Sequence, residues 1–252
     1  MINTVLTGTP TDQPPLLIVH GLYGSARNWG AIAKRMSDAR QVLSVDMRNH
    51  GESDWFDSHS YADMASDLAE VITANGGHVD VIGHSMGGKA AMVLALLHPT
   101  LVRRVIVADI APVTYTHTQV GFIDVMRRLD LSLVEKRSDA DRLMAADVKD
   151  AGVRAFLLQS LDVKAKRWRL NLDVLEAEMP DIMGFPDLDG PFSGPTLFLS
   201  GGASDYVLSE HRTGIKALFP KARFARIPDV GHWLHAEKPR EFAAIAQAFL
   251  SA

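Results

Sequence analysis

The sequence contains no cysteine. This absence excludes a disulfide framework, a thiolate nucleophile and a metal site with cysteine ligands, and it agrees with a reducing compartment. No apolar run approaches the roughly 18 residues that a membrane-spanning helix needs, and the first residues lack the basic-then-apolar pattern of a signal peptide. A formal net charge of −4 argues against nucleic acid as a partner. We therefore expect a cytoplasmic protein that binds neither a membrane nor nucleic acid.

What the sequence does contain is an alternation of short β-rich runs with longer helical ones, which is typical of βα units on a largely parallel sheet. With 252 residues, of which 47% are hydrophobic and 22% charged, the chain is long enough for one large α/β domain with an insertion. Strands are expected at residues 16–20, 41–45, 79–82, 104–108, 196–200 and 223–227, and helices at residues 26–36, 60–74, 86–97, 209–219 and 239–250.

Between the two sets of strands the character of the sequence changes. The strand signals disappear, and short amphipathic helical stretches replace them, among them residues 120–129 and 165–179. A stretch rich in glycine and proline then marks the return to strand-helix alternation. We therefore divide the chain into a core of residues 1–112 and 184–252 and an inserted helical cap of residues 113–183.

The segment Gly83-His84-Ser85-Met86-Gly87 is the most informative of the chain, because it directly follows an apolar β-like run and precedes a helical one. This is the setting of a nucleophile elbow, a sharp strand-to-helix turn that holds a serine in a strained conformation at the carboxyl edge of a sheet. Such a turn leaves room only for small residues two positions to either side, and both positions are glycine. The start of the helix would stabilise negative charge there. Ser85 is therefore the candidate nucleophile.

Two other interpretations of these residues stay open. Residues 83–89 also spell G-x-x-x-x-G-K, which is a phosphate-binding loop in all but its last position, where Ala90 supplies no hydroxyl for magnesium. The second alternative is a glycine-rich turn with an uninvolved serine. Neither alternative gains support from the rest of the chain.

Four motifs, in order along the chain, resemble those of the α/β-hydrolase superfamily. They are His20-Gly21 after the first strong strand, the D-x-R-x-x-G-x-S segment at residues 46–53, the elbow, and Gly231-His232 with Glu237 and Pro239. More narrowly, residues 109–112, 167–169 and 231–239 resemble segments of small bacterial esterases and the related mitochondrial abhydrolase-domain proteins. The resemblance implies an α/β-hydrolase fold, with a mostly parallel central sheet flanked by helices and an inserted helical cap. We interpret the segment at residues 46–53 as mainly structural.

A serine hydroxyl needs a base with a pKa near 7, and histidine is the side chain that offers one. Among ten histidines, His232 lies on a glycine-preceded loop after the last strand, from which its imidazole can reach Ser85. His84 should face away from Ser85, because neighbours on a strand point to opposite faces. Acyl transfer also needs backbone N–H donors for the oxyanion, and the resemblance implies those of Leu22 and Met86.

Two aspartates qualify as the acid of a catalytic triad, and both keep the chain order Ser, Asp, His. Asp205 follows the strand at residues 196–200, in the G-x-x-D position that most members of the superfamily use. Asp109 ends the preceding strand, and the relatives that share residues 109–112 draw their acid from there. We favour Asp109, with Asp205 as a second partner or a pocket residue.

Together these residues predict a serine carboxylic-ester hydrolase that forms an acyl-enzyme on small to medium acyl esters and needs no cofactor or metal. An acyl-CoA thioesterase and a lactonase, such as an enol-lactone hydrolase, share the same triad. A non-catalytic binding protein of the same fold is the alternative from another class. The residues expected to bind substrate are Tyr23, His84, Trp168 and Trp233.

One cluster on the cap suggests a sharper hypothesis. Lys164, Lys166, Arg167 and Arg169 would offer positive charge to the phosphates of an acyl-CoA substrate, although charge runs on helices are usually only solvated. The sequence leaves the oligomeric state open between monomer and homodimer.

Overall fold

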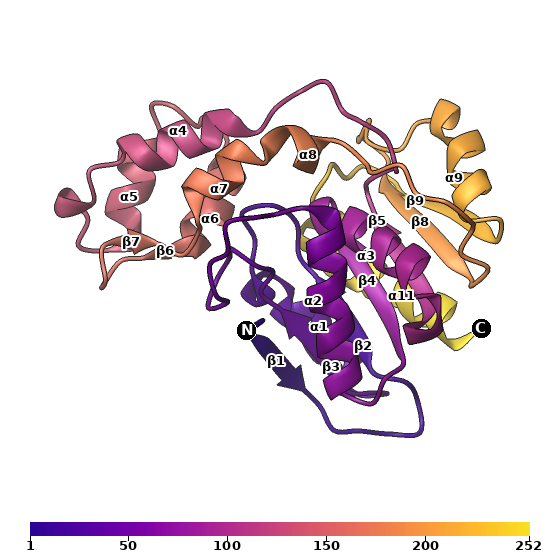
Figure 1. Cartoon of the computed structure of the whole chain (residues 1–252). Coiled ribbons are helices and arrows are strands. Elements are labelled where there is room, and N and C mark those ends of the chain that lie inside the picture. The colour runs from indigo at the N-terminus through magenta and orange to yellow at the C-terminus, as the bar shows by residue number, and fades with distance from the viewer.

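A computed structural model describes residues 1–252 and shows a seven-stranded sheet with helices on both faces (Figure 1). The strand order is β1-β3-β2-β4-β5-β8-β9, and only the β1–β3 pair is antiparallel. The strands are β1 (Thr4–Thr7), β2 (Leu16–Val19), β3 (Val42–Val45), β4 (Val79–His84), β5 (Val102–Ala108), β8 (Thr196–Gly201) and β9 (Ala222–Ile227). The sequence did not predict β1, because this short edge strand has exposed side chains and no buried apolar run.

Two hydrophobic cores lie on opposite faces of this sheet, because successive side chains of a strand point to opposite faces. Val81 of β4 belongs to the larger core, and its neighbour Ile82 belongs to the smaller one. The larger core is covered by α2 (Tyr61–Ala74), α3 (Met86–Leu97) and α9 (Arg212–Leu218), and the smaller one by α1 (Gly30–Met36), α10 (Leu234–Glu237) and α11 (Pro239–Ser251). The strands that carry the site are therefore buried on both faces and held rigidly.

Between β5 and β8 the chain leaves the central sheet and forms short helices and one hairpin, which Figure 1 shows gathered at one end of the molecule. These elements are α4 (Val120–Arg128), α5 (Arg137–Met144), α6 (Ala151–Leu157), β6 (Leu161–Asp162), β7 (Arg167–Trp168), α7 (Leu172–Ala177) and α8 (Met179–Met183). We call residues 113–183 the cap segment. No helix of the chain is long and apolar enough to cross a membrane.

The expected helix at residues 165–179 is wrong for its first part. Residues 161–168 form the antiparallel β6–β7 hairpin instead, with Lys166 at a φ of 54° in the turn. The Asp162 carboxylate accepts a hydrogen bond from the Ala165 N–H at 3.0 Å and so fixes the reversal of the chain. Helical structure begins only with α7, at Leu172.

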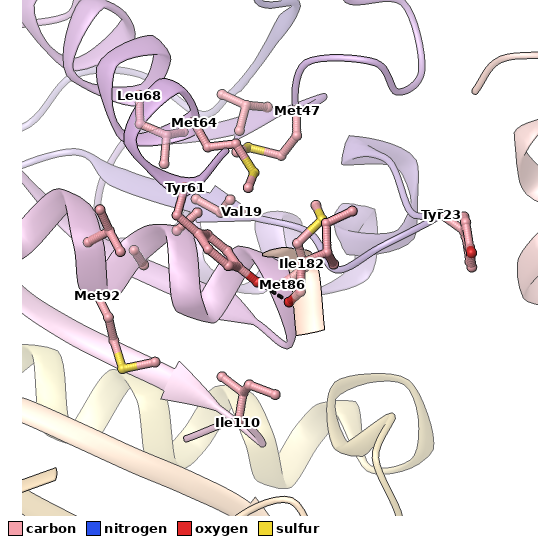
Figure 2. Packing of buried hydrophobic residues seen from close by; sticks show 14 of the residues in the cluster. Val19, Tyr23, Met47, Tyr61, Met64, Leu68, Met86, Met92, Ile110 and Ile182 are labelled. Atoms are coloured by element: carbon pink, nitrogen blue, oxygen red, sulfur yellow. Dashed lines mark hydrogen bonds between the residues drawn. The ribbon is translucent and has the colours of Figure 1, made fainter. Parts of the chain in front are cut away.

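The cap segment shares the larger core with the sheet. Ile123, Leu175 and Ile182 of the cap segment are buried in the same hydrophobic cluster as Met86 and Ile110. Figure 2 shows Tyr61 of α2 reaching Ile182, whose carbonyl oxygen accepts a hydrogen bond from the Tyr61 hydroxyl at 2.7 Å. The cap segment therefore packs on the sheet edge near the elbow.

Candidate active site

The elbow joins β4 to α3, and Ser85 occupies the strained position at its tip, with φ 52° and ψ −123°. The flanking glycines are required by close backbone approaches. A Cβ on Gly83 would lie 2.2 Å from the Gly87 carbonyl oxygen, and a Cβ on Gly87 would lie 2.3 Å from that of His20. Both distances are far shorter than any real contact, so a larger residue would push strand and helix apart.

His232 lies on the loop after β9 and lines the same cavity as Ser85. Its Nδ1 lies 2.8 Å from Asp109 Oδ2. A carboxylate only accepts hydrogen bonds, so we assign the proton to Nδ1, which leaves Nε2 as an acceptor. The ring also stacks on that of Tyr206, with centroids 4.1 Å apart. These contacts fix the orientation of the imidazole and the tautomer that a general base requires.

The carboxylate of Asp109 is fully buried at the end of β5. Besides His232, it accepts hydrogen bonds from the Gly201 N–H at 2.9 Å and from the Ser204 hydroxyl. Asp205 is exposed, and its carboxylate makes no hydrogen bond or ion pair, so it contacts neither His232 nor Asp109. Of the two aspartates considered from the sequence, only Asp109 reaches the histidine.

No hydrogen bond joins Ser85 Oγ to His232 Nε2 in this structure, although both residues line one cavity. Hydrogen bonds of this kind are often long or poorly aligned without substrate and tighten in the complex. The structure thus brings the candidate nucleophile, base and acid to one cavity, with the Asp109–His232 contact formed.

Two backbone N–H groups at the cavity have no hydrogen-bond partner. The Leu22 N–H makes no hydrogen bond, and the Met86 N–H is the first of helix α3 and so has no acceptor within the helix. Both residues line the cavity with Ser85. Free donors next to a serine hydroxyl are the geometry that an oxyanion requires.

Two buried histidines hold the loop that carries Leu22. His50 Nε2 accepts a hydrogen bond from the Tyr23 N–H at 3.1 Å, and His20 Nε2 accepts one from the Met47 N–H at 2.9 Å. Burial lowers the pKa of both imidazoles, which therefore stay neutral and accept. His50 belongs to the segment at residues 46–53 that we interpreted as structural. Its contact with the oxyanion loop was not predicted, because the motif does not show where its histidine points.

The cavity is mainly apolar, since 14 of its 20 lining residues are hydrophobic. Tyr23, His84 and Trp233 line it, as do residues that the sequence analysis did not single out: Tyr61, Lys89, Ile110, Tyr115, Gln119, Phe122, Val153, Phe156, Leu157, Ile182, Met183 and Tyr206. Eight of these come from the cap segment, and their positions relative to Ser85 depend on tertiary packing. A cavity with this lining suits an apolar acyl group.

His84 also packs behind the site. Its Nε2 lies 2.9 Å from the His232 carbonyl oxygen, and its ring lies between those of His232 and His235. His84 therefore supports the loop of the candidate base while it lines the same cavity as Ser85.

The expectation that Trp168 binds substrate is corrected by the structure. Its indole is buried within the cap segment, where Nε1 donates to the Met126 carbonyl oxygen at 2.9 Å, and it does not line the cavity. A tryptophan whose only polar atom is paired inside a core has a packing role.

Two of the four residues of the basic cluster are engaged in contacts within the protein. Arg169 forms ion pairs with Glu52 and Asp162, and Lys166 donates to the Val134 carbonyl oxygen. None of the four basic residues lines the cavity. The structure therefore gives no support to a phosphate site at this cluster. No group of three or more His, Asp or Glu side chains is placed to hold a metal ion.

Comparisons with known proteins agree with this geometry. The model of the alpha/beta hydrolase family matches residues 16–245. The mouse sn-1-specific diacylglycerol lipase ABHD11 is 42% identical over 94% of this chain and 81% of its own length, and Escherichia coli esterase YbfF is 37% identical over 90% and 89%. The solved structure of a marine microorganism esterase, 38% identical, superposes with a TM-score of 0.93 over 98% of both chains. With the elbow, the sheet order and the match all in place, the chain belongs to the α/β-hydrolase family.

Proposed function

We propose that this protein is a serine carboxylic-ester hydrolase with Ser85 as nucleophile, His232 as general base and Asp109 as the acid that orients it. The observation that carries the proposal is the 2.8 Å contact between His232 Nδ1 and a buried Asp109 carboxylate, at the cavity into which the Ser85 elbow opens. The relatives printed as esterases and lipases support ester hydrolysis as the reaction.

The chemistry runs in two halves. Ser85 Oγ attacks the ester carbonyl carbon while His232 Nε2 takes the hydroxyl proton, and the N–H groups of Leu22 and Met86 stabilise the oxyanion. His232 then gives this proton to the departing alcohol, which leaves an acyl-enzyme on Ser85. In the second half, water attacks the acyl carbon with His232 again as base, and the carboxylic acid departs as Ser85 regains its proton. Asp109 holds the imidazole and stabilises its charged form throughout.

Small to medium acyl esters are the substrates that suit the apolar cavity. Acyl-CoA thioesters and lactones would react through the same residues, and the basic cluster on the cap segment lies outside the cavity, so it favours neither. The partner is a small-molecule ester. The cytoplasmic location expected from the sequence stays a prediction.

Hydrolysis rates over p-nitrophenyl esters, acyl-CoA thioesters and lactones of increasing chain length test this proposal. We expect Ser85→Ala to lower kcat on every accepted substrate by on the order of 10⁴-fold or more while the fold stays intact. Ser138→Ala, an exposed serine of α5, is the matched control and should leave the rates unchanged. A Ser85→Ala variant with turnover near that of the wild type would overturn the assignment.

A further inference from the structure

Lys89 is a buried lysine that the proposed mechanism does not use. It lies on α3, four residues after Ser85, and is 1% exposed. Side chains of a helix lean toward its N-terminus, so the lysine stem leads back toward the elbow. Lys89 lines the cavity and is the only Lys, Arg, Asp or Glu among the lining residues. It therefore places the one basic side chain of the cavity on the helix that follows the candidate nucleophile.

The hydrogen bonds of this ammonium group are incomplete. Nζ donates to the Met183 carbonyl oxygen at 2.8 Å and to that of Gly184, and it forms no ion pair with a carboxylate. An ammonium group has three N–H donors, so one is left without an acceptor. The rings of Tyr115 and Tyr61 lie 4.9 Å and 5.9 Å from Nζ. A donor on the cavity wall remains available to a ligand.

The neighbouring tyrosine hydroxyls do not complete this set. The Tyr61 hydroxyl donates to Ile182, as Figure 2 shows, and the Tyr115 hydroxyl donates to the Tyr206 carbonyl oxygen at 2.7 Å. Nζ donates to neither hydroxyl, since its only acceptors are the carbonyl oxygens of Met183 and Gly184. The positive charge sits among aromatic rings and backbone carbonyls with no counter-charge of the protein.

A role in anchoring the cap segment would not by itself explain why residue 89 is a lysine. Tyr61 and Lys89 do hold the carbonyls of Ile182, Met183 and Gly184, where α8 ends. A neutral donor would make the same contacts without the cost of burying an unpaired charge. Burial lowers the pKa of Lys89 to about 7, because desolvation disfavours the charged form and no carboxylate of the protein compensates it. An anionic group in the cavity would supply that compensation.

We infer that Lys89 is a specificity residue that binds a carboxylate at the far end of the acyl group, so that preferred substrates are half-esters of dicarboxylic acids. This inference rests on the proposed ester hydrolysis and names its substrate class. The apolar walls contact the methylene groups of such an acyl chain, Ser85 attacks its ester end, and Lys89 meets its charged end.

The test compares two p-nitrophenyl esters with acyl chains of equal length, the glutarate half-ester and the pentanoate, in the wild type and in Lys89→Met. A hydrogen bond to a charged group corresponds to roughly 10- to 150-fold. We expect the ratio of kcat/KM between the glutarate half-ester and the pentanoate ester to fall by about this factor in Lys89→Met, whatever common loss both esters show from the altered cavity wall. Lys89→Arg, which keeps the charge, should retain part of the preference. An equal loss on both esters, with the ratio unchanged, would show that Lys89 only anchors the cap segment and would overturn the inference.

A second measurement needs no variant and so does not depend on the folding of Lys89→Met. Glutarate and pentanoate are compared as competitive inhibitors of pentanoate-ester hydrolysis by the wild type. Stronger inhibition by glutarate supports the inference, and equal inhibition contradicts it. Failure here leaves the pentanoate-ester hydrolysis standing, whereas failure of the proposed function would appear as hydrolysis that survives in Ser85→Ala.

Discussion

The carboxyl edge of the sheet and the cap segment differ in how their residues are held. At the edge, neighbouring backbone segments lie so close together that only glycine fits at some positions. A Cβ on Gly83 or on Gly201 would lie 2.2 Å from a backbone carbonyl oxygen. In the cap segment, Gly121 of α4 has nothing within 4 Å of a Cβ position, and the helices meet through side chains. Short sequence motifs therefore determine the backbone geometry of the edge, whereas side-chain packing determines how the helices of the cap segment are arranged. We accordingly expect substitutions at the edge to lower kcat, and substitutions in the cap segment to change the preference among substrates.

The largest effect expected from this comparison concerns the two aspartates at the edge. Asp109→Asn should lower kcat by roughly 10⁴-fold, because the amide cannot hold His232 in the required tautomer. Asp205→Asn removes an exposed carboxylate without partners and should change kcat less than about twofold. Steady-state kinetics of both variants on one ester measures this. Collapse of activity in Asp205→Asn with activity kept in Asp109→Asn would reverse our assignment.

The sensitivity of the fold to acid should come from buried histidines outside the cap segment. Burial lowers the pKa of His59 and of His235 to about 3, and His20, His50 and His84 are lowered by burial as well. The cap segment has only the exposed His117. Between pH 3 and about 6.5 these histidines bind protons in the unfolded chain but stay neutral in the native protein. Protonation therefore favours the unfolded chain, and stability that is present above pH 6.5 is lost as the pH falls.

From pH 6.5 to pH 5, the loss from His59 and His235 should be about 2 kcal/mol each. Urea unfolding at the two pH values measures it. His235→Phe keeps an aromatic ring against Trp29 and should reduce the slope with pH, whereas His78→Gln, on the surface, should not. A free energy of unfolding that does not change over this range would refute the account of the buried histidines.

Paired glycine substitutions compare edge and cap segment directly. Gly83→Ala should destabilise the protein by about 1–3 kcal/mol, since its Cβ meets the Gly87 backbone and forces strand and helix apart. Gly121→Ala, in open space on helix α4, should stabilise it by up to about 1 kcal/mol. Thermal unfolding of the two variants measures this. An unchanged stability of Gly83→Ala would contradict the comparison between edge and cap segment.

A smaller effect is expected for substitutions of two aromatic residues of the cap segment, only one of which lines the cavity. Phe156 lines the cavity beside Trp233, so Phe156→Ala should change the ratio of kcat/KM between long and short acyl esters by about fivefold. Trp168→Ala removes a packed ring away from the cavity and should lower stability while the ratio stays constant. The ratio is measured over a chain-length series, and a shift in Trp168→Ala alone would restore the original expectation for that residue.

The sequence predicted the edge well for a physical reason. Each edge feature needs one residue type at one place, such as glycine at positions 83 and 87, so the motif specifies the geometry. The choice between Asp109 and Asp205 needed the structure, because both follow neighbouring strands and only the buried Asp109 contacts His232. The β6–β7 hairpin could not be predicted from the sequence, because its residues have helical spacing but a turn at Lys166 makes them pair as strands. The cavity lining could not be predicted either, because it depends on contacts between residues far apart along the chain.

Labelling with a fluorophosphonate tests the central claim most directly, because the reagent reacts only with a serine activated by its surroundings. Peptide mass spectrometry of the labelled wild type should place one adduct on Ser85, with none in Ser85→Ala and much slower labelling in His232→Ala and Asp109→Asn. Unchanged labelling of Asp205→Asn should accompany this. Absence of an adduct in the folded wild type, or an adduct on another serine, would contradict the account.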